Sequence, residues 1–556
     1  MPRHTVLSEG TDYLYTHTCT DACDHGSELR DQITLDTVLD YDTGALAEDF
    51  NLDNFGGFGF GFRGKLIADL DQVVDQIFSG NSHNITGSNR ITYTFLQGDN
   101  LVGLYNNPQY GFGASNGAAP FTAAQMDAAR ASIALWDDLI APEFVESNGR
   151  GADIQFANSW DPAQAYAYYP EYGFTNARGY NFFGDVFVAD PRSYFDADGA
   201  LLHEGNYSNG DLSFGGYGAT TLTHEIGHAI GLSHPGAYNG AGATTYLDQA
   251  EYAQDSEQYS IMSYWGASET GARIVNWGTF FFSNAQTPML HDVYTIQQVY
   301  GADPTTRADD TTYGFNSTAD REVFDFTQNE HPYLTIYDAG GIDTIDLSGF
   351  EASVLIDLRD GQFSSAGQGN ITTADQAEAL QSLNDAIEVA YGIEDYYAPA
   401  DQAMIDSVTS RYMGLNARDI AADTGHAGVE AMQYQNISIA YGTEIENAVG
   451  TDYRDVIITN EQDNVLTGNG GADVFVFASD ERLFTDSFTN GGTDIITDFE
   501  EGVDTVDLSG LGITEASTLT AIDNRLEIDI DSDGVIDQTI IFENLDAIPV
   551  GDILFG

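Results

Sequence analysis

Three closely spaced histidines constrain this chain more than any other feature of its sequence. His224, His228 and His234 lie in residues 223–235, which read THEIGHAIGLSHP. On a helix, His224 and His228 would project from one face one turn apart, because residues four apart are neighbours on a helix surface. The helix can end at Gly231, since glycine adopts left-handed conformations at low cost, and the chain can then bring His234 back to the other two rings.

This spacing predicts a catalytic zinc site. Imidazole nitrogens are common zinc ligands, and three protein ligands leave the fourth position open for water, whereas structural zinc sites are closed. Glu225 follows the first histidine and can act as a base on that water without binding the metal. The alternative is a buried helix with satisfied core histidines, and the third histidine followed by Pro235 argues against it.

A second stretch, residues 260–265 (SIMSYW), follows the third histidine. A methionine in a tight turn, Met262, can lie beneath the three histidines and give the metal an apolar floor. The long zinc motif followed by such a turn resembles the metzincin peptidases, and Pro235 with the Ser-x-Met-Ser-Tyr-Trp run resembles their serralysin branch. The resemblance implies that Tyr264 binds zinc at rest and then hydrogen-bonds the oxyanion. The alternative for Tyr264 is an ordinary core aromatic.

The resemblance implies an α+β fold class. It implies that a metzincin zinc-peptidase domain is followed by an all-β domain, a parallel β-roll or β-sandwich with a helical insertion. The chain has 556 residues, enough for several domains. We expect a leader or pro-segment over residues 1–64 and a peptidase domain over residues 65–300. A calcium-binding β-roll domain is expected over residues 301–556, with an insertion within it over residues 372–432.

Periodicity predicts the elements of the peptidase domain. Apolar residues at helical spacing predict helices over residues 66–78 and 121–140, and Pro288 opens a last helix. Thr122 and Gln125 can form a capping box at the start of the second helix. Strands are predicted over residues 90–96, 152–156 and 185–188.

Another segment resembles the family's edge strand along the substrate cleft. A peptide substrate would add to that strand by pairing with its outer backbone groups. An ordinary edge strand is the alternative. The expected substrate-binding residues are Ala165, Tyr166, Ala167 and Tyr168.

Residues 450–476 form three nine-residue segments in one phase. This is a degenerate form of the nonapeptide repeat of the calcium-binding parallel β-roll. Each turn would bury its apolar residue and offer carbonyls and aspartates to calcium. A solenoid without metal is the alternative. Glycines are missing from the first two copies, so some of these calcium sites can be empty. The sixth place of each segment holds Asp455, Asn464 or Asp473. The eighth place holds Ile457, Leu466 or Phe475.

The resemblance implies further calcium ligands between the peptidase domain and these repeats. Residues 307–311 and 338–343 match paired segments that share calcium, and residues 444–446 match another ligand pair. The family usually has threonine where Glu444 stands, but a backbone carbonyl ligand there is unaffected. With Asp455 and Asp473, the expected ligands are Arg307, Asp309, Thr311, Asp338, Gly340, Gly341, Asp343, Glu444 and Glu446.

A separate acidic loop lies near the C-terminus. Asp529, Asp531, Asp533 and Asp537, with Gly534 at the turn, have the spacing of an isolated calcium loop. Only half of an EF-hand is present. An occupied cation site and an ordinary acidic turn therefore both remain open.

The chain is strongly acidic, with 18 Lys+Arg against 87 Asp+Glu and a net charge of −69. Nucleic acid and anionic membrane surfaces are therefore poor partners, because binding phosphates needs a basic surface, and no nucleic-acid partner is expected. The acidity fits bound calcium, salt tolerance or both. No apolar run is long enough to span a bilayer, so no membrane span is expected.

The sequence favours a secreted, extracellular protein. The first residues lack the charged and apolar regions of a secretory signal. A C-terminal signal read by a type I export apparatus reconciles this with an extracellular peptidase, and the resemblance implies one. Residues 551–556 resemble the family's acidic-then-apolar ending. The expected partners are protein or peptide substrates and that apparatus.

Both cysteines, Cys19 and Cys23, lie in the expected leader. They can form a small local disulfide in an oxidising compartment. Alternatively, a thiolate can reach the active-site zinc and hold the enzyme latent. The resemblance favours a disulfide or an inert pair, since serralysins seldom rely on cysteine.

These observations favour a secreted zinc-dependent endopeptidase that hydrolyses peptide bonds with metal-activated water and Glu225 as general base. The alternative is a calcium-stabilised surface or adhesion protein whose peptidase-like domain is an inactive scaffold. The intact Glu225 argues against that alternative, because a scaffold needs no base. The insertion over residues 372–432 departs from the family, and we expect a helical hairpin that packs on the β-roll or recognises a partner.

Overall fold

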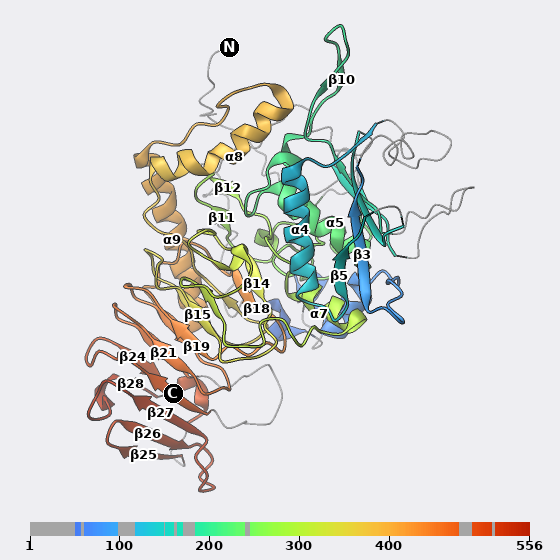
Figure 1. The fold of residues 1–556 in the computed structure, drawn as a ribbon. Helices are drawn as coiled ribbons and strands as arrows, with labels where there is room; N and C mark the ends of the chain where they lie inside the picture. Colours follow the sequence, from blue (N-terminus) through green and yellow to red (C-terminus); the bar gives the residue numbers. More distant parts are fainter. Residues whose placement is uncertain are drawn as a thin grey trace.

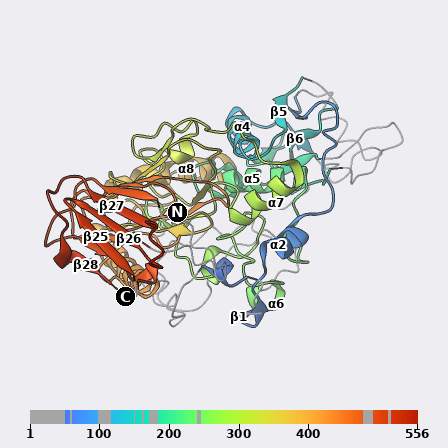
Figure 2. The same ribbon diagram turned by 90° about the horizontal axis from the view of Figure 1, so that it is seen from below.

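The computed structural model describes residues 51–56, 61–97, 117–148, 151–160, 164–170, 184–239, 245–477, 492–513 and 517–555. Helices and one mixed sheet dominate the first half, and short strands dominate the second. Figures 1 and 2 both show β25–β28 at one end of the molecule, away from α4 and β5. Cys19 and Cys23 lie outside the described residues.

The first half contains a six-stranded sheet in the order β5–β3–β6–β8–β7, with β4 paired to β6. Strands β5, β3, β6 and β8 run parallel, whereas the edge strand β7 is antiparallel to β8. The three strands predicted in this region are present, with ends shifted by a few residues. The bounds are β3 (Arg90–Phe95), β4 (Ala118–Ala119), β5 (Glu143–Glu146), β6 (Ile154–Ser159), β7 (Ala165–Ala167) and β8 (Val186–Ala189).

Helices α4 (Ala123–Asp137) and α5 (Tyr217–Ile230) pack against each other beside this sheet (Figure 1). The predicted capping box of Thr122 and Gln125 begins α4. Trp136 near the end of α4 is fully buried, and its Nε1 donates to the carbonyl of Thr223 on α5 at 3.0 Å. This bond fixes the position of α5 where the histidine motif begins.

Helix α2 (Leu70–Ile77) is shorter than the predicted range of residues 66–78. Leu66 lies instead in a hairpin of β1 (Gly61–Phe62) and β2 (Lys65–Leu66). Asp69 then starts the helix through a capping box with Gln72. The apolar spacing therefore located the helix, but the cap set its first residue.

Helix α7 (Leu290–Tyr300) begins two residues after Pro288 and ends at Gly301, whose φ is 79°. The first half also contains the helix α6 and two short hairpins. Their bounds are α6 (Tyr246–Gln249), β9 (Tyr194–Phe195), β10 (Leu201–His203), β11 (Val275–Asn276) and β12 (Phe281–Phe282).

Residues 51–56 pack against the rest of the fold: Asn51 and Leu52 are buried and the other four residues are partly buried. The Asp53 carboxylate accepts hydrogen bonds from His291 Nε2 at 3.0 Å, from Gln254 Nε2 at 2.8 Å and from the Tyr441 hydroxyl. These partners come from both halves of the chain. This short segment, which holds the 3-10 helix Leu52–Phe55, therefore ties the two halves together.

The second half contains two sheets of mainly parallel strands. Their orders are β13–β15–β19–β21–β23–β27–β26–β25 and β16–β20–β22–β24–β28. The bounds in the first are β13 (Thr312–Gly314), β15 (Thr344–Asp346), β19 (Asn447–Val449), β21 (Val465–Thr467), β23 (Thr493–Ile496), β25 (Thr518–Ile522), β26 (Arg525–Asp529) and β27 (Gln538–Phe542). Those in the second are β16 (Leu355–Asp357), β20 (Val456–Ile458), β22 (Val474–Val476), β24 (Thr505–Asp507) and β28 (Ile553–Leu554).

The nine-residue phase predicted over residues 450–476 is present. Strands β20, β21 and β22 are nine residues apart and alternate between the two sheets, so that β20 pairs with β22 and β19 with β21. Ile457, Leu466 and Phe475 are fully buried in one core shared by both sheets. Each repeat therefore supplies one strand and turns its eighth residue inward.

Helices α8 (Thr373–Tyr391) and α9 (Gln402–Thr424) form the predicted hairpin within residues 372–432. Helix α8 begins with a capping box formed by Thr372 and Asp375, and Thr372 takes the extended conformation just before the helix. A small sheet of β14 (Leu334–Ile336), β17 (Phe363–Ser364) and β18 (Ile437–Ile439) adjoins them in sequence.

The hairpin contacts both halves of the chain. The Tyr412 ring of α9 packs edge-on against Trp277, with centroids 5.0 Å apart. After α9, His426 Nε2 lies 2.7 Å from a carboxylate oxygen of Asp507 on β24. In the part of the chain that the structure describes, no helix has the length and apolar character needed to cross a bilayer.

Candidate active site

Helix α5 carries His224, Glu225 and His228, and almost all of its residues are buried. It ends at Gly231, whose φ is 120° and whose N–H donates to the carbonyls of Gly227 and His228. A Cβ at position 231 would lie 2.2 Å from the carbonyl oxygen of Asn81. Glycine is therefore required here on two grounds, and the chain turns back as predicted.

The turn brings His234 to the other two histidines. The Nε2 atoms of His224, His228 and His234 lie 3.0 to 3.3 Å from one another. Nitrogens held about 2.0–2.1 Å from one tetrahedral zinc are roughly 3.3–3.4 Å apart, so the observed cluster is close to that spacing. The three histidines are also one of two sets of at least three His, Cys, Asp or Glu side chains, among the described residues, whose ligand atoms lie within 4.8 Å of one another.

The opposite nitrogen of each ring is bound to the backbone. The Nδ1 atoms of His224, His228 and His234 lie 2.8, 2.7 and 3.2 Å from the carbonyl oxygens of Ile261, Leu232 and Tyr238. A carbonyl only accepts, so each Nδ1 carries the proton and each Nε2 presents a lone pair. The donor set therefore fits a zinc ion.

Burial favours the neutral rings that a metal needs. It lowers the pKa of His224 to about 4 and that of His228 to about 3, where the nearby charge of His224 adds to the effect. Burial also holds the pKa of His234 well below its usual value. The cluster therefore stays uncharged at neutral pH, when its lone pairs are available.

Met262 lies against the histidine helix, as expected from the turn at residues 260–265. It is fully buried, and a Cβ added at Gly227 would lie 2.6 Å from its sulfur. The preceding residue, Ile261, supplies the carbonyl that binds His224 Nδ1. The turn therefore both packs on the helix and orients its first histidine.

Asp292 on α7 holds this turn, a role that sequence reasoning missed. Its buried carboxylate accepts from Ser260 Oγ at 2.6 Å, from the N–H of Ile261 at 2.6 Å and from the N–H of Met289 at 2.8 Å. The hydrogen-bonded chain thus runs from α7 through the turn to His224. The sequence signal for this role is weak: His291 and Asp292 form a polar pair in the first turn of α7.

Tyr264 lies beside the histidines. Its ring centroid is 4.3 Å from that of His234 and 4.9 Å from that of Tyr238. The Tyr238 hydroxyl donates to Asp255 at 2.6 Å, and Asp255 also accepts from Ser263 Oγ at 2.8 Å. Burial raises the pKa of Asp255 to about 7. These bonds join the loop after His234 to the turn that carries Tyr264.

Glu225 is buried, with 2% of its surface exposed. Tyr169 is close by: its ring centroid is 5.7 Å from that of His228, and burial together with the charge of Glu225 raises its pKa. Tyr169 follows the edge strand β7, which packs against α5. Sequence reasoning did not single out Tyr169, which bears no motif of its own.

The predicted substrate strand lies at the edge of the sheet next to α5. Ala165, Tyr166 and Ala167 form β7 and pair on their inner side with β8. Tyr168 lies just beyond; its N–H donates to the carbonyl of Asp185, and its own carbonyl accepts from Gly184. Strand β7 is thus the edge strand of the sheet and lies against the histidine helix.

The structure brings together most of the residues predicted to bind calcium after the peptidase region. Asp343 Oδ1 accepts from the N–H of Thr311 at 2.7 Å, and the Asp343 N–H donates to Glu446 at 2.6 Å. Asp338 accepts from the N–H of Gly340 at 2.8 Å. Burial, with the charges of Asp338 and Glu446, raises the pKa of Asp343 to about 7.

The remaining residues that were expected to bind calcium in this region do not all offer a side chain to the cluster. A Cβ at Gly341 would lie 2.9 Å from the backbone of Asp309, so these two segments touch. The Arg307 guanidinium forms an ion pair with Asp138 at 2.7 Å, so only its backbone could bind a cation. Glu444 is exposed; burial, with the charge of Glu444 in addition, raises the pKa of Glu446.

Asp455 and Asp473 form a ladder through the parallel strands. Asp455 Oδ1 accepts from the N–H of Val354 at 2.8 Å, Asp473 Oδ1 from that of Asp455 at 2.9 Å, and Asp504 from that of Asp473 at 2.9 Å. Burial raises the pKa of Asp455 to about 7 and that of Asp473 to about 8. Such buried carboxylates fit a bound cation, because a cation offsets the cost of ionising them.

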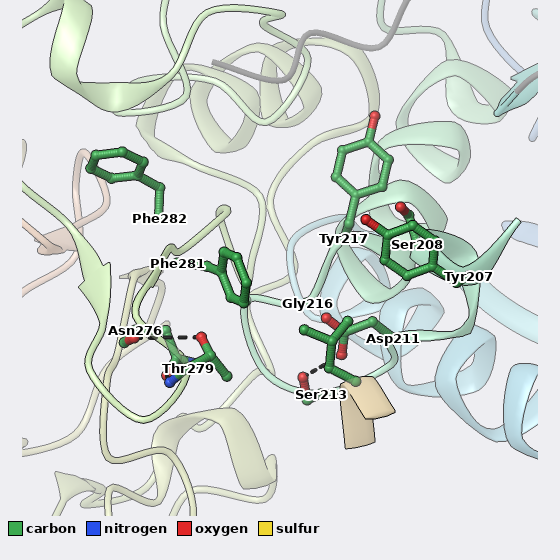
Figure 3. Close-up of a pocket in the computed structure, with 12 residues that line it drawn as sticks. Tyr207, Ser208, Asp211, Ser213, Gly216, Tyr217, Asn276, Thr279, Phe281 and Phe282 are labelled. Carbon is green, nitrogen blue, oxygen red and sulfur yellow. Dashed lines mark hydrogen bonds between the residues drawn. The ribbon is translucent and has the colours of Figure 1, made fainter. Parts of the chain in front are cut away.

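A pocket lies at the other end of α5 from the histidines. It is formed where the helix begins, at Gly216 and Tyr217, and includes Asp211, Phe281 and Leu383 of α8 (Figure 3). Ser213 Oγ donates to Asp211 there at 2.7 Å. This pocket includes none of the histidines and is separate from the candidate active site.

Comparison with known proteins supports the resemblance. The family described as "Peptidase M10 serralysin C terminal" matches residues 302–387 and 418–531. Serralysin C of Dickeya chrysanthemi is 35% identical over 339 residues, which cover 57% of this chain and 62% of that protein. Metallopeptidase AprA of Pseudomonas marginalis is 31% identical over 490 residues, which cover 83% of this chain and 82% of that protein.

Coverage differs between relatives. The chain spans less than two thirds of serralysin C, and a serralysin of Photorhabdus sp. (strain Az29), 35% identical, aligns over 54% of its length. Serralysin G of Dickeya chrysanthemi is 30% identical and aligns over 78% of its length. Because identity of 30% or more extends over most of both chains for two relatives, the chain belongs to the serralysin family of metallopeptidases.

Proposed function

We propose that this protein is a secreted zinc-dependent endopeptidase. A metzincin domain over residues 65–300 would cleave peptide bonds, and a calcium-binding parallel β-roll over residues 301–556 would follow it. The observation that carries the proposal is the convergence of three Nε2 atoms within 3.3 Å, next to the buried Glu225. An inactive scaffold would have no need for this arrangement.

His224, His228 and His234 would hold the zinc. Zinc bound there would supply Lewis-acid activation of the scissile carbonyl and of a water molecule. Glu225 would take the proton of the attacking water and deliver it to the leaving amine. Tyr264, next to His234, would rest as a further zinc ligand and then donate a hydrogen bond to the oxyanion.

The edge strand would position the substrate. An extended peptide can add to the outer edge of β7, pairing with the backbone of Ala165, Tyr166 and Ala167, with Tyr168 at the strand's end. This placement runs the peptide beside α5, so that its scissile bond can approach Glu225. Protein and peptide substrates are therefore the proposed partners.

Calcium would bind the clusters around Asp338, Asp343 and Glu446 and the ladder of Asp455 and Asp473. Gly340 and Gly341 shape the first cluster, and Asp309, Thr311 and the backbones of Arg307 and Glu444 would complete it. Low calcium inside a cell would leave these carboxylates repelling one another, and millimolar calcium outside would order the domain. This fits passage through a type I exporter and an extracellular site of action.

A removable leader would end before Asn51. Asp53 is buried against His291, Gln254 and Tyr441, so cutting within residues 51–56 would leave those groups without their carboxylate. We therefore place the end of the pro-segment earlier than residue 64. Sequencing the N-terminus of the mature enzyme measures this directly.

Chelation of the metal tests the proposed activity. Full-length protein should hydrolyse casein, lose activity when a zinc-selective chelator is added in calcium-containing buffer, and recover it with added zinc. Calcium in the buffer keeps loss of β-roll structure from being mistaken for loss of zinc. Undetectable hydrolysis by zinc-loaded, folded protein would instead favour a calcium-stabilised surface protein with an inactive scaffold.

A further inference from the structure

The hairpin that joins β26 to β27 lies outside the parallel coils. Its turn contains Asp529, Asp531, Asp533 and Asp537, and the strands that it joins are antiparallel. The matched family region ends at residue 531, within this turn. The turn therefore belongs neither to the histidine site nor to the calcium clusters proposed above.

The three leading carboxylates converge. Asp529, Asp531 and Asp533 each offer one oxygen, and these oxygens lie within 4.8 Å of one another. Two oxygens bound about 2.3–2.6 Å from one calcium ion are separated by at most roughly 5 Å, so the cluster is compatible with a single ion. Asp531 and Asp533 are exposed, whereas Asp529 is buried.

Asp529 provides an independent indication of a ligand. The residue is only 5% exposed, and its Oδ1 is a buried atom with no hydrogen-bond partner in the described part of the chain. Its Oδ2 accepts from the N–H of Gly534 at 3.0 Å, which keeps the carboxylate inside the turn. A buried carboxylate oxygen without a donor is costly, and a cation is the partner that removes this cost.

The turn has the chemistry of a calcium loop. Counting Asp529 as position 1, aspartates stand at positions 1, 3, 5 and 9, and Gly534 stands at position 6 with a φ of 91°. Position 7 in such loops supplies a backbone carbonyl. None of the ion pairs formed among the described residues uses the four aspartates of this turn, so no basic side chain in that part of the chain neutralises them.

We propose that this turn binds one calcium ion, which fixes the β26–β27 hairpin. An EF-hand loop has a bidentate glutamate at position 12. In this turn, position 12 is Ile540, which is buried in the core. Without that ligand, the affinity should lie at the weak end of calcium loops, on the order of 10⁻⁴–10⁻³ M, as in extracellular modules. The site would therefore fill outside a cell.

Hydrogen exchange of the full-length protein tests this assignment. Peptides covering residues 525–542 should gain protection as calcium is raised through the millimolar range, and magnesium at the same concentration should give less protection. In Asp531→Asn, the midpoint for this hairpin should move to about tenfold higher calcium, since affinity follows the number of charged ligands. Asp531 is exposed, and an asparagine oxygen can still accept from the N–H of Asp533, so the turn itself should survive.

A matched control separates this site from the rest of the domain. Asp523→Asn makes the same charge change in the neighbouring β25–β26 turn, where Asp523 is exposed. It should leave the hairpin midpoint unchanged, and neither variant should shift the midpoint for peptides covering residues 456–477. An unshifted hairpin midpoint in Asp531→Asn, or full protection without calcium, would overturn the proposal.

Discussion

Replacing Asp292 by alanine should loosen the turn beneath the candidate zinc site. Asp292 is fully buried and accepts from two backbone N–H groups, those of Ile261 and Met289, and from Ser260 Oγ. Each buried donor left without an acceptor costs about 1–3 kcal/mol. The two N–H groups alone therefore predict a loss of about 2–6 kcal/mol in the free energy of unfolding.

The same substitution should weaken zinc binding. Ile261 supplies the carbonyl that orients His224, and loss of such an outer contact typically lowers metal affinity by about 10–100-fold. Asp292→Asn should lose less of both quantities, because its amide oxygen can still accept from the two N–H groups. Urea unfolding, followed by circular dichroism, and competition with a chromophoric zinc chelator measure the two effects.

An exposed residue on the same helix provides the control. Gln298→Ala removes a polar side chain from α7 without touching the turn, and should change the free energy of unfolding by no more than about 0.5 kcal/mol. The proposed role of Asp292 would be refuted if Asp292→Ala unfolded and bound zinc like this control. If Asp292→Ala had normal stability but weakened zinc binding, only the predicted loss in the free energy of unfolding would be refuted.

Three further predictions concern other parts of the molecule. Tyr264→Phe should lower kcat more than it raises KM, because the proposed hydrogen bond forms mainly in the transition state; equal kcat values would remove it from the mechanism. Burial raises the pKa of Asp507, but hydrogen bonds from His426 and Ser509 outweigh this and lower it to about 2. The resulting stability should be complete above the unfolded pKa near ~4 and be lost as the pH falls towards 2, and acid unfolding of Asp507→Asn should lack this component. Calcium removal should unfold residues 301–556 before the zinc domain, which would show as two calorimetric transitions in place of one.

Local patterns in the sequence predicted the parts of the fold that depend on neighbouring residues. The histidine helix, its end at Gly231 and the nine-residue strands all follow from spacing along one segment. Thr122 and Gln125 capped α4 as expected because both partners lie within one turn. The start of α2 was misplaced because apolar spacing continues through Leu66, although Asp69 supplies the cap that begins the helix.

Residues that depend on distant partners were not predictable in this way. Asp292 contacts a turn about thirty positions earlier in the chain, and Asp53 contacts Tyr441 from the other half. Nothing in the local sequence specifies these partners. Tyr169 likewise joins the site only because the sheet places the end of β7 next to α5.

The most direct test of the account is the activity of Glu225→Gln in its zinc-loaded form. Glutamine keeps the size of the side chain but cannot accept the proton of the attacking water. We expect one zinc per chain, an unchanged circular dichroism spectrum and a kcat lowered by about 10²–10⁴-fold, the usual contribution of a general base. A zinc-loaded variant with kcat within about tenfold of the parent would contradict the assignment of Glu225 as the base.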